Sequence, residues 1–278
     1  MQYRAEQIRK SGKTIAFVPT MGYLHKGHLS LMVHGHKLAD HLVASIFVNP
    51  TQFGPNEDLS MYPRDLKRDT ALAEEAGVDI LFTPGEKDLY PAGFETYVSQ
   101  TALPEHLCGL SRPGHFRGVA TIVAKLFNIV KPHFAIFGEK DFQQLAIIRK
   151  MVKDLNFDVE IIGAATIREP DGLAMSSRNA FLSETHRKSA LVLYRCLTDA
   201  KQMAMAGEKD PQKIIDTCEA AIHAEADTAI DYIAICHPDT LEDVAVIDQP
   251  VVMALAVKVG STRLIDNLML FPPGSAPG

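Results

Sequence analysis

Short apolar runs alternate with longer amphipathic stretches over the first 170 residues of the chain. The runs are rich in β-branched and aromatic residues and end at Pro, Gly or Asn, so we expect strands at 14–19, 42–50, 78–84, 133–138 and 158–163. Four of these five runs are nearly continuous in apolar character, which is typical of strands covered on both faces. Helical patterns lie between them, at about 26–40, 62–76, 115–131 and 140–155. Strands that alternate with helices predict an α/β fold with a Rossmann-like, doubly wound parallel sheet.

The pattern changes after about residue 170. Ser183 is a plausible N-cap and Gly207 a plausible stop, which predicts one helix between them, and a second helix is expected at about 211–226. Three strand candidates follow, at 230–237, 251–260 and 262–268. We therefore expect a first domain over 1–170 and a smaller C-terminal α+β domain over 171–271. The tail "PPGSAPG" (272–278) cannot pack a core and is expected to be disordered.

Composition narrows the class of protein. A hydrophobic content of 46%, a charged content of 22% and a net charge of −6 are those of an ordinary globular protein, and they argue against a nucleic-acid or membrane partner. The four cysteines form no Cys-x-x-Cys pair, which favours free thiols in a reducing compartment. The N-terminus lacks the apolar core of a signal peptide, and no stretch reaches the roughly 18 apolar residues of a membrane span. We expect a soluble, cytoplasmic protein.

Polar residues follow three of the predicted strands. Because ligands of open parallel sheets bind beyond the carboxyl ends of the strands, these residues are candidates for a site. They are His25 and His28 after the first strand, Asn49 and Gln52 after the second, and Gly138, Glu139, Lys140 and Asp141 after the fourth. No one of these signals is strong, but all of them point to one edge of the sheet.

The stretch "TMGYLHKGHLSLM" (20–32) places two histidines at the start of a helix. A helix N-terminus favours anions, Gly27 lets a ligand approach the backbone, and imidazoles donate hydrogen bonds to phosphate oxygens. A phosphate site is one interpretation, and a structural or capping role is the other. A metal site is the least favoured, because the His-Glu-x-x-His spacing and a third ligand are absent from the motif.

The next two segments supply neutral amides and one lysine. In "NPTQFGPNEDLSMYPR" (49–64), the amides of Asn49 and Gln52 suit the hydroxyl and carboxylate groups of a small substrate, although Asn49 could simply end a strand before proline. In "FGEKDFQQL" (137–145), Lys140 offers a point charge for phosphate, whereas an acid in the first turn could merely complement the helix dipole. Gln143 and Gln144 are about 100° apart on a helix, so at most one of them faces a cleft squarely.

Two further segments carry cations. In "EPDGLAMSSRNAFLS" (169–183), Ser176, Ser177 and Arg178 form a phosphate-gripping set, or else belong to a solvated linker between the domains. "RPGHFRGVATIVAKL" (112–126) adds Arg112, His115 and Arg117, either as another cationic wall or as a charged surface loop.

These blocks match a known pattern. "HKGH" after a first parallel strand resembles the His-x-Gly-His signature of the nucleotidyl-transferring superfamily that includes class I aminoacyl-tRNA synthetases. Together, "PTMGYLHKGH", "SIFVNPTQFGPNEDLSMYPR", "FGEKDFQQL" and "DGLAMSSRN" resemble the pantoate–β-alanine ligase (pantothenate synthetase) family, in order and over nearly the whole chain. The N-terminus is some residues shorter than is usual in that family, which leaves open whether an opening strand or helix segment is missing or reassigned.

The resemblance implies an ATP-dependent ligation with Mg²⁺ in two steps. The pantoate carboxylate attacks the α-phosphorus of ATP, giving pantoyl adenylate and pyrophosphate, and the β-alanine amine then displaces AMP to give pantothenate. Two alternatives stay open: a nucleotidyltransferase of the same superfamily that retains AMP in its product, and a nucleotide-sensing module that binds ATP without turnover.

The resemblance also implies roles for individual residues. Gln52 and Gln144 bind pantoate, Gln52 also lies near β-alanine, and Asp141 is a candidate metal ligand. The residues expected to be catalytic are His28, His25, Lys140 and Arg178. The residues expected to bind ATP are Met21, Gly22, Tyr23, Leu24, His25, Lys26, Gly27, His28, Gly138, Glu139, Lys140, Asp141, Ile167, Met175, Ser176, Ser177 and Arg178. In this interpretation the first domain binds ATP and pantoate, the smaller domain is a candidate lid, and the protein is a homodimer.

Overall fold

The computed structural model describes residues 1–55, 57, 59–273 and 275. The chain forms two compact units, which are described separately. The first unit comprises residues 1–101, 112–139 and 144–167, and the second comprises residues 102–111, 140–143 and the described residues from 168 onward. Residues 274 and 276–278 of the tail, for which we expected disorder, lie outside the described residues.

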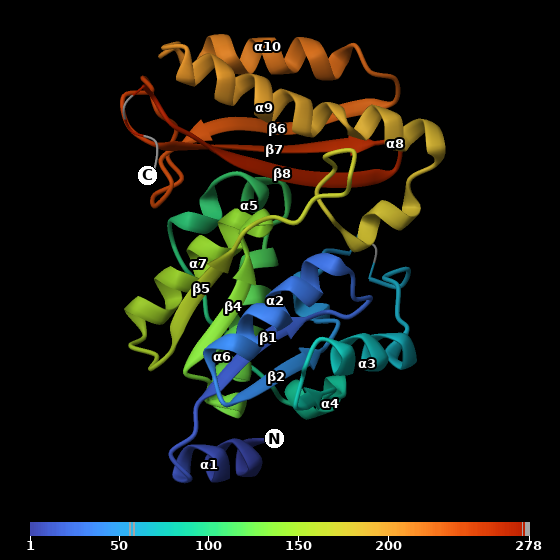
Figure 1. The fold of residues 1–278 in the computed structure, drawn as a ribbon, viewed down its shortest axis with the longest axis vertical. Coiled ribbons are helices and arrows are strands. Elements are labelled where there is room, and N and C mark those ends of the chain that lie inside the picture. Colours follow the sequence, from blue (N-terminus) through green and yellow to red (C-terminus); the bar gives the residue numbers. More distant parts are fainter. Residues whose placement is uncertain (56, 58, 274, 276–278) are drawn as a thin grey trace. The chain divides into compact units, whose positions relative to one another are not determined.

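A parallel sheet forms the centre of the first unit (Figure 1). Its strands are β1 (Ile15–Thr20), β2 (His41–Ile46), β3 (Ile80–Phe82), β4 (Phe134–Gly138) and β5 (Glu160–Ala164). They lie in the order β3-β2-β1-β4-β5, and each neighbouring pair is parallel. Residues 15–18 of β1 are fully buried, as a continuous apolar run predicts. The predicted Rossmann-like sheet is confirmed.

The order of the strands decides where a ligand can bind. β1 pairs with β2 on one side and with β4 on the other, so the chain leaves β1 in one direction and returns on the opposite side. This reversal is the topological switch point, where open parallel sheets leave a crevice at the carboxyl ends of the strands. The loops after β1 and β4 therefore begin at the same edge of the sheet.

The helices of the first unit follow the apolar pattern closely. The predicted ones are α2 (Lys26–Leu38), α3 (Leu66–Glu75), α6 (His115–Val130) and α7 (Phe142–Asp154), the last of which starts in the second unit. α3 begins four residues later than expected, because the Asp65 carboxylate caps it by accepting from the Arg68 N–H. Two further helices, α1 (Gln2–Lys10) and the short α4 (Glu86–Leu89), were not predicted.

Two predicted strands are shorter in the structure by at least three residues. β2 ends at Ile46, because the chain turns toward Pro50, which has no N–H for a ladder and starts the 3₁₀ turn η1 (Pro50–Gln52). β3 keeps three of the seven residues expected for it, Ile80–Phe82.

The second unit contains an antiparallel sheet and a pair of long helices (Figure 1). The strands β6 (Thr228–Cys236), β7 (Val251–Val259) and β8 (Thr262–Leu270) lie in sequence order, and α8 (Glu184–Ala190), α9 (Val192–Met205) and α10 (Pro211–His223) precede them. Buried residues of α9 and α10 pack with β7 in one apolar cluster. We expected a single helix between Ser183 and Gly207, but the structure has two, because Leu191 ends α8 and caps the start of α9. The sequence does not show this break, since the residues on both sides of it favour a helix.

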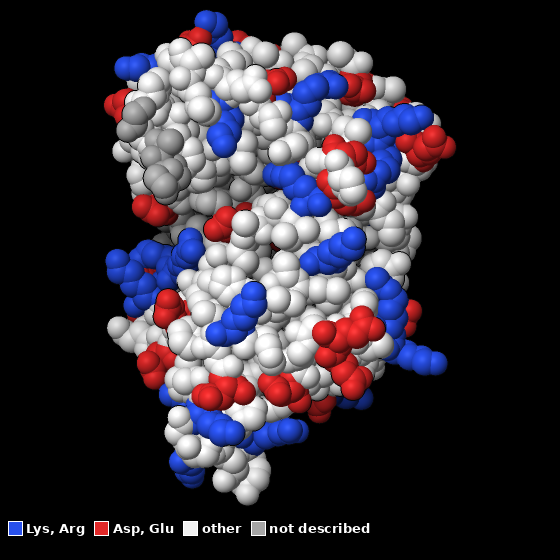
Figure 2. Space-filling view, in the orientation of Figure 1, with Lys and Arg blue, Asp and Glu red and all other residues white. Residues whose placement is uncertain are grey.

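Short helical turns complete the second unit and its borders. They are η2 (Leu103–Glu105), α5 (Cys108–Ser111), η3 (Glu139–Asp141) and η4 (Ser177–Phe181). In the part of the chain that the structure describes, no helix is both long enough and apolar enough to cross a bilayer. Acidic and basic side chains are interspersed over the face drawn in Figure 2.

Candidate active site

The loop after β1 has a strained backbone that glycine makes possible. Gly22 and Tyr23 both have positive φ, at 85° and 49°. A Cβ on Gly22 would lie 3.0 Å from Cγ2 of Ile46 and 3.1 Å from Oδ2 of Asp69, so a side chain has almost no room there. Tyr23 also adopts the left-handed conformation, although its side chain disfavours it. Surrounding contacts must therefore hold the backbone of Tyr23 in place.

Asp69 on α3 provides those contacts. The backbone N–H groups of Tyr23 and Leu24 donate to its two carboxylate oxygens, at 2.6 and 2.7 Å. Asp69 is 1% exposed, and the neighbouring Arg68 donates to the Leu24 carbonyl at 2.9 Å. Hydrogen bonds from amides to a buried carboxylate are among the stronger ones in proteins, so this residue fixes the loop. The sequence did not single out Asp69, because nothing distinguishes it from the other charged residues of that helix.

The two histidines of the motif cap the start of α2. Nδ1 of His25 accepts from the Gly27 N–H at 3.1 Å, and Nδ1 of His28 accepts from the His25 N–H at 3.3 Å. Their ring centroids are 4.0 Å apart. An Nδ1 atom that accepts carries no hydrogen, so each neutral ring is the Nε2–H tautomer and offers Nε2 as a donor. Capping and anion binding are therefore compatible roles for the same pair.

Asn49 is a structural residue that sets the orientation of Gln52. It is 1% exposed, and its Nδ2 donates to Oε1 of Gln52 at 3.0 Å and to the Gly118 carbonyl at 3.1 Å. Its Oδ1 accepts from the hydroxyls of Thr51 and Tyr90, at 2.9 and 2.8 Å. Because Oε1 of Gln52 is turned toward Asn49, Nε2 is the donor at the other end of the amide. It lies 3.2 Å from Sδ of Met21, so the loops after β1 and β2 meet.

The helix α6 approaches η1 so closely that only glycine fits between them. A Cβ on Gly118 would lie 2.4 Å from the Thr51 carbonyl oxygen. Two residues that precede and start this helix also hold the Gln52 segment: Nδ1 of His115 is 2.8 Å from the Gln52 carbonyl, and Arg112 pairs with Glu57 at 2.5 and 2.7 Å. Burial alone would raise the pKa of Glu57, but hydrogen bonds and the charge of Arg112 outweigh it and hold that pKa below its usual range.

The two adjacent glutamines at the start of α7 belong to different units and have different surroundings. Gln143 is 5% exposed; its Oε1 accepts from the Cys108 N–H, and its Nε2 donates to the carbonyls of Leu103 and His106. All of these groups lie in the second unit. Gln144 lies in the first unit and is half-buried. Two other predicted site residues, Gly138 and Ile167, are also half-buried and lie in the same unit. Gln143 is thus a structural residue, and the substrate role of Gln144 stays a prediction.

Lys26 and Glu139 also lie in the first unit, whereas Lys140, Asp141 and Met175–Arg178 lie in the second unit. Lys140 and Asp141 form a weak pair there, with Nζ and Oδ1 4.0 Å apart, and the Lys140 carbonyl accepts from Nδ2 of Asn267 at 2.8 Å. Ser176 caps η4 by accepting from the Arg178 N–H at 3.2 Å. Met175, Ser176, Ser177 and Arg178 are all half-buried.

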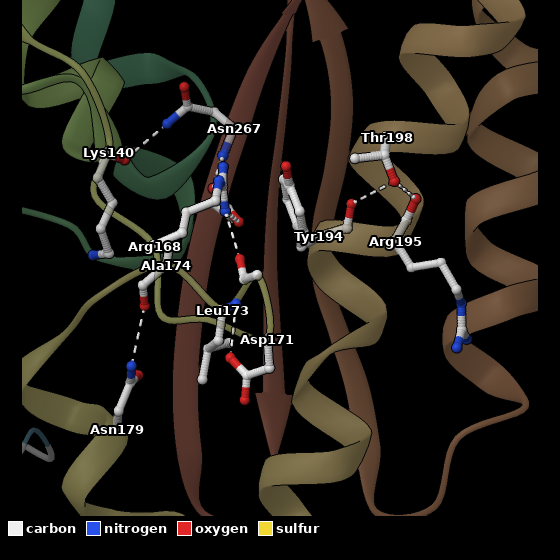
Figure 3. A network of polar contacts seen from close by, with 12 residues as sticks. Lys140, Arg168, Asp171, Leu173, Ala174, Asn179, Tyr194, Arg195, Thr198 and Asn267 are labelled. Atoms are coloured by element: carbon white, nitrogen blue, oxygen red, sulfur yellow. Dashed lines mark hydrogen bonds and ion pairs between the residues drawn. The ribbon is translucent and has the colours of Figure 1, made fainter.

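The loop that leads to these residues is anchored by charged side chains (Figure 3). Arg168 donates to both carboxylate oxygens of Asp266, at 2.6 and 2.9 Å, and to the Gly172 carbonyl at 3.2 Å. Its guanidinium carbon lies 4.1 Å from the centre of the Tyr194 ring. Gly172 has a φ of 95°, and a Cβ there would lie 2.3 Å from the same ring.

A second set of contacts ties the loop to α8. Glu169 accepts from Nδ2 of Asn179 at 2.8 Å and from Arg187 at 2.7 Å, and Arg187 also donates to Asp171 at 2.6 Å. Asn179 reaches back to the Ala174 carbonyl at 3.1 Å. The segment is therefore an ordered loop with internal bonds, and the interpretation as a solvated linker is wrong.

Nearly the whole chain matches a family model. The family model described as pantoate–β-alanine ligase matches residues 1–269. This chain belongs to that family.

Relatives support the assignment at high identity. The pantothenate synthetase of Desulfatibacillum aliphaticivorans is 61% identical over 272 residues, which are 98% of this chain and 97% of the relative. The crystal structure of the pantothenate synthetase from Thermus thermophilus is 47% identical with a TM-score of 0.92, covering 96% of this chain and 98% of that one. A pantoate–β-alanine ligase structure from Francisella tularensis, complexed with β-γ ATP and β-alanine, is 36% identical with a TM-score of 0.78, covering 96% and 95%.

Membership in the pantoate–β-alanine ligase family makes the chain a carbon–nitrogen ligase of pantothenate biosynthesis. The alternative of a nucleotidyltransferase that keeps AMP in its product is not favoured. Four residues that support the candidate site were not found from the sequence, because none of them belongs to a motif and each makes its contacts only in the folded chain. They are Asp69, Arg168, Asp266 and Asn267.

Proposed function

We propose that this chain condenses pantoate with β-alanine at the expense of ATP, through pantoyl adenylate. The observation that carries the proposal is the pair of capping histidines, which present Nε2–H donors at a helix N-terminus beside the switch point of the sheet. The ligase with bound ATP analogue and β-alanine from Francisella tularensis supports the same substrates for this chain.

In the first step a carboxylate oxygen of pantoate attacks the α-phosphorus, and the bond to the bridging oxygen breaks as pyrophosphate leaves. Negative charge grows on the phosphate oxygens, so preorganised donors stabilise the transition state by roughly 3 kcal/mol each. The first unit supplies His25 and His28 as such donors. The family pattern also assigns Lys140, Ser176, Ser177 and Arg178 to the phosphates.

Pantoate is held by neutral amides. Because Asn49 fixes Oε1 of Gln52, the amide presents its Nε2 donor rather than its oxygen to a carboxylate. Gln144 is the second amide of the proposed set. A neutral donor orients the carboxylate without the strong ion pair that would reduce its nucleophilicity.

The second step needs orientation more than acid–base help. The β-alanine amine attacks the acyl carbon of the mixed anhydride, the bond to the AMP oxygen breaks, and the amine loses a proton. AMP is a good leaving group, so placing the two reactants together supplies most of the rate. Gln52, which lies at the junction of the loops after β1 and β2, is the residue proposed to hold β-alanine.

Mg²⁺ is expected with the triphosphate, and Asp141 offers a suitable oxygen donor. Its carboxylate is 47% exposed and lies 4.0 Å from the Lys140 ammonium group. The described residues contain no cluster of three or more metal-ligating side chains, so one carboxylate with phosphate and water oxygens would hold the ion. When bound, Mg²⁺ neutralises phosphate charge, and Lys140 does the same from the protein side.

One assay tests the proposal. AMP formation that requires pantoate and β-alanine together, and pantoate-dependent ATP–pyrophosphate exchange without β-alanine, are the expected results. AMP retained in the product would instead support the nucleotidyltransferase, and ATP binding without turnover would support a sensing module. The homodimer expected from the resemblance and the cytoplasmic location expected from the composition stay predictions, the former testable by analytical ultracentrifugation.

A further inference from the structure

Two buried polar residues stand side by side on the last strand of the second unit. Asp266 is 3% exposed and Asn267 is 9% exposed, within a strand whose ends, Thr262 and Leu270, are also buried. Burying a carboxylate and an amide is unfavourable unless both have hydrogen-bond partners. The partners of this pair show what it does.

Asn267 holds the turn that carries Lys140. Its Nδ2 donates to the Lys140 carbonyl at 2.8 Å, across 127 residues of sequence (Figure 3). Lys140 lies in the 3₁₀ turn η3, between the end of β4 and the start of α7. Fixing the carbonyl of a residue in a single turn fixes the direction in which its side chain leaves the backbone.

Asp266 holds the loop that carries Met175–Arg178. It pairs with both terminal guanidinium nitrogens of Arg168, and its Oδ1 also accepts from the Asn267 N–H at 2.8 Å. Arg168 in turn forms an isolated antiparallel bridge with Ala174, the residue directly before Met175. The carboxylate therefore fixes Arg168, and the bridge from Arg168 to Ala174 fixes the start of the Met175–Arg178 segment.

We propose that Asp266 and Asn267 are positioning residues for adenylation, which together set Lys140 and the Met175–Arg178 segment in the geometry that grips the phosphates of ATP. The inference rests on the proposed function, which assigns those two segments to the nucleotide. Neither residue of the pair needs to touch the substrate, because each acts through a hydrogen bond to a segment that does. Since the two are neighbours on one strand, the two segments share a single support.

The pair predicts an asymmetric effect on the two chemical steps. Adenylation must stabilise charge on all three phosphates, whereas the second step starts from an adenylate that has lost two of them. Misplacing a phosphate donor by a fraction of an ångström can reduce the first step by one to two orders of magnitude. The second step should change little.

The test measures the half-reactions separately. Pantoate-dependent ATP–pyrophosphate exchange reports adenylation, and pantothenate formation from added pantoyl adenylate and β-alanine reports the second step. Asn267→Ala and Asp266→Asn should each lower exchange about 10- to 100-fold and change the second half-reaction less than about twofold. Equal losses in both half-reactions, or no loss of exchange, would overturn the proposal.

A matched control lies on the same sheet. Asp231 on β6 also pairs with an arginine, Arg263, at 2.6 and 2.9 Å, and accepts from Ser111 at 2.8 Å. Asp231→Asn should leave both half-reactions nearly unchanged. If circular dichroism shows that Asn267→Ala does not fold, Asn267→Ser takes its place under the same criteria. Serine also removes the amide donor to the Lys140 carbonyl, and it alters the packing less than alanine does.

A double-mutant cycle separates this inference from the proposed function. If Asn267 acts through Lys140, then Lys140→Ala combined with Asn267→Ala should be no slower in exchange than Lys140→Ala alone. Fully additive losses would overturn the positioning role. Absence of pantoate-dependent exchange in the unaltered protein would instead overturn the proposed function, so the two failures are distinguishable.

Discussion

Two loops of the molecule carry the predicted phosphate-binding groups, and they are held in different ways. Residues 21–28 of the first unit are fixed by backbone contacts: two amides donate to one buried carboxylate, and two imidazoles cap the following helix. Residues 168–178 of the second unit are fixed by charged side chains from β8 and α8. The first loop takes its shape from a carboxylate 46 residues away and from its own two imidazoles, whereas the second takes it from ion pairs with partners 16 to 98 residues away.

The difference teaches where each loop is vulnerable. A buried carboxylate with two amide donors is insensitive to salt but intolerant of substitution, because a lost partner leaves a buried polar group unsatisfied. In the second loop, the half-exposed pairs of Arg187 tolerate the loss of one member but are screened by salt, whereas the carboxylate that pairs with Arg168 is itself buried. Four variants test this contrast.

The largest effect is expected from His28 in the first loop. His28→Ala should lower pantoate-dependent ATP–pyrophosphate exchange by about two or more orders of magnitude, because a preorganised donor to the developing phosphate charge is lost. The fold should stay intact, as measured by circular dichroism.

Two further substitutions separate the two roles of this ring. His28→Asn can still accept from the His25 N–H in place of Nδ1, whereas His28→Gln carries an N–H group near the place of Nε2. The glutamine variant should keep more exchange activity than the asparagine variant. Near-normal exchange in His28→Ala would contradict the assignment altogether.

The next effect is expected at the carboxylate that holds the first loop. Asp69→Asn turns an N–H₂ group toward one of the two backbone amides that now donate to Asp69. The free energy of unfolding should fall by about 1–3 kcal/mol, measured by urea denaturation, and exchange should fall about tenfold. Asp65→Asn is the control on the same helix, because asparagine caps a helix as well as aspartate does. Equal effects of the two substitutions would show that the contacts of Asp69 with the first loop contribute no more than a helix cap does.

An intermediate effect is expected from glycine in the second loop. Gly172 and Gly207 have nearly the same φ, at 95° and 98°, but a Cβ on Gly172 would clash with the Tyr194 ring, whereas nothing lies within 4 Å at Gly207. Both alanine variants should lose roughly 1 kcal/mol of stability to backbone strain. Gly172→Ala alone should also raise KM for ATP several-fold in a steady-state assay. A similar rise in Gly207→Ala would refute the link between that clash and the nucleotide.

The smallest effect is expected from the exposed end of the second loop. Burial would raise the pKa of Asp171, but hydrogen bonds and charge from Arg187 outweigh it, so the folded-state pKa lies below the usual value. The pair therefore stabilises the protein above the ordinary aspartate pKa, and this contribution is lost as pH falls through the lowered folded-state value.

Asp171→Asn should thus lower stability by less than about 1 kcal/mol at neutral pH and low salt. The difference in melting temperature between the variant and the unaltered protein should shrink on acidification and in high salt. Asp69→Asn should keep most of its effect in high salt, because the carboxylate it replaces is buried. The opposite pattern of salt dependence would reverse the comparison between the two loops.

Most of the fold could be predicted because its signal is local. The five strands of the first unit are apolar runs. Polar candidates follow three of these strands, and the family pattern also selects all of them except Asn49. α1 escaped prediction because Ala5 is its buried residue and no apolar stripe marks it. The break at Leu191 escaped because helical segments lie on both sides of it.

The supporting residues of the site could not be predicted, for a different reason. Asp69 acts on Tyr23 across 46 residues, and Asp266 acts on Arg168 across 98 residues. Their types are common on protein surfaces, and only the tertiary structure shows that they are buried with charged or amide partners. Sequence patterns identify residues that contact a ligand more readily than they identify the residues that hold those ligand-binding residues in place.

The adjacent glutamines of α7 have a consequence for how the gene can vary. One base change, from C to G at the first position, turns any glutamine codon into one for glutamate. At Gln143 a carboxylate would face the carbonyls of Leu103 and His106, to which the amide now donates. Such an allele would be removed because the chain folds poorly. At Gln144 the same change would place a negative charge beside pantoate under the proposed function, and selection would act on turnover in a well-folded protein. Selection for folding would therefore keep glutamine at position 143, and selection for activity would keep it at position 144.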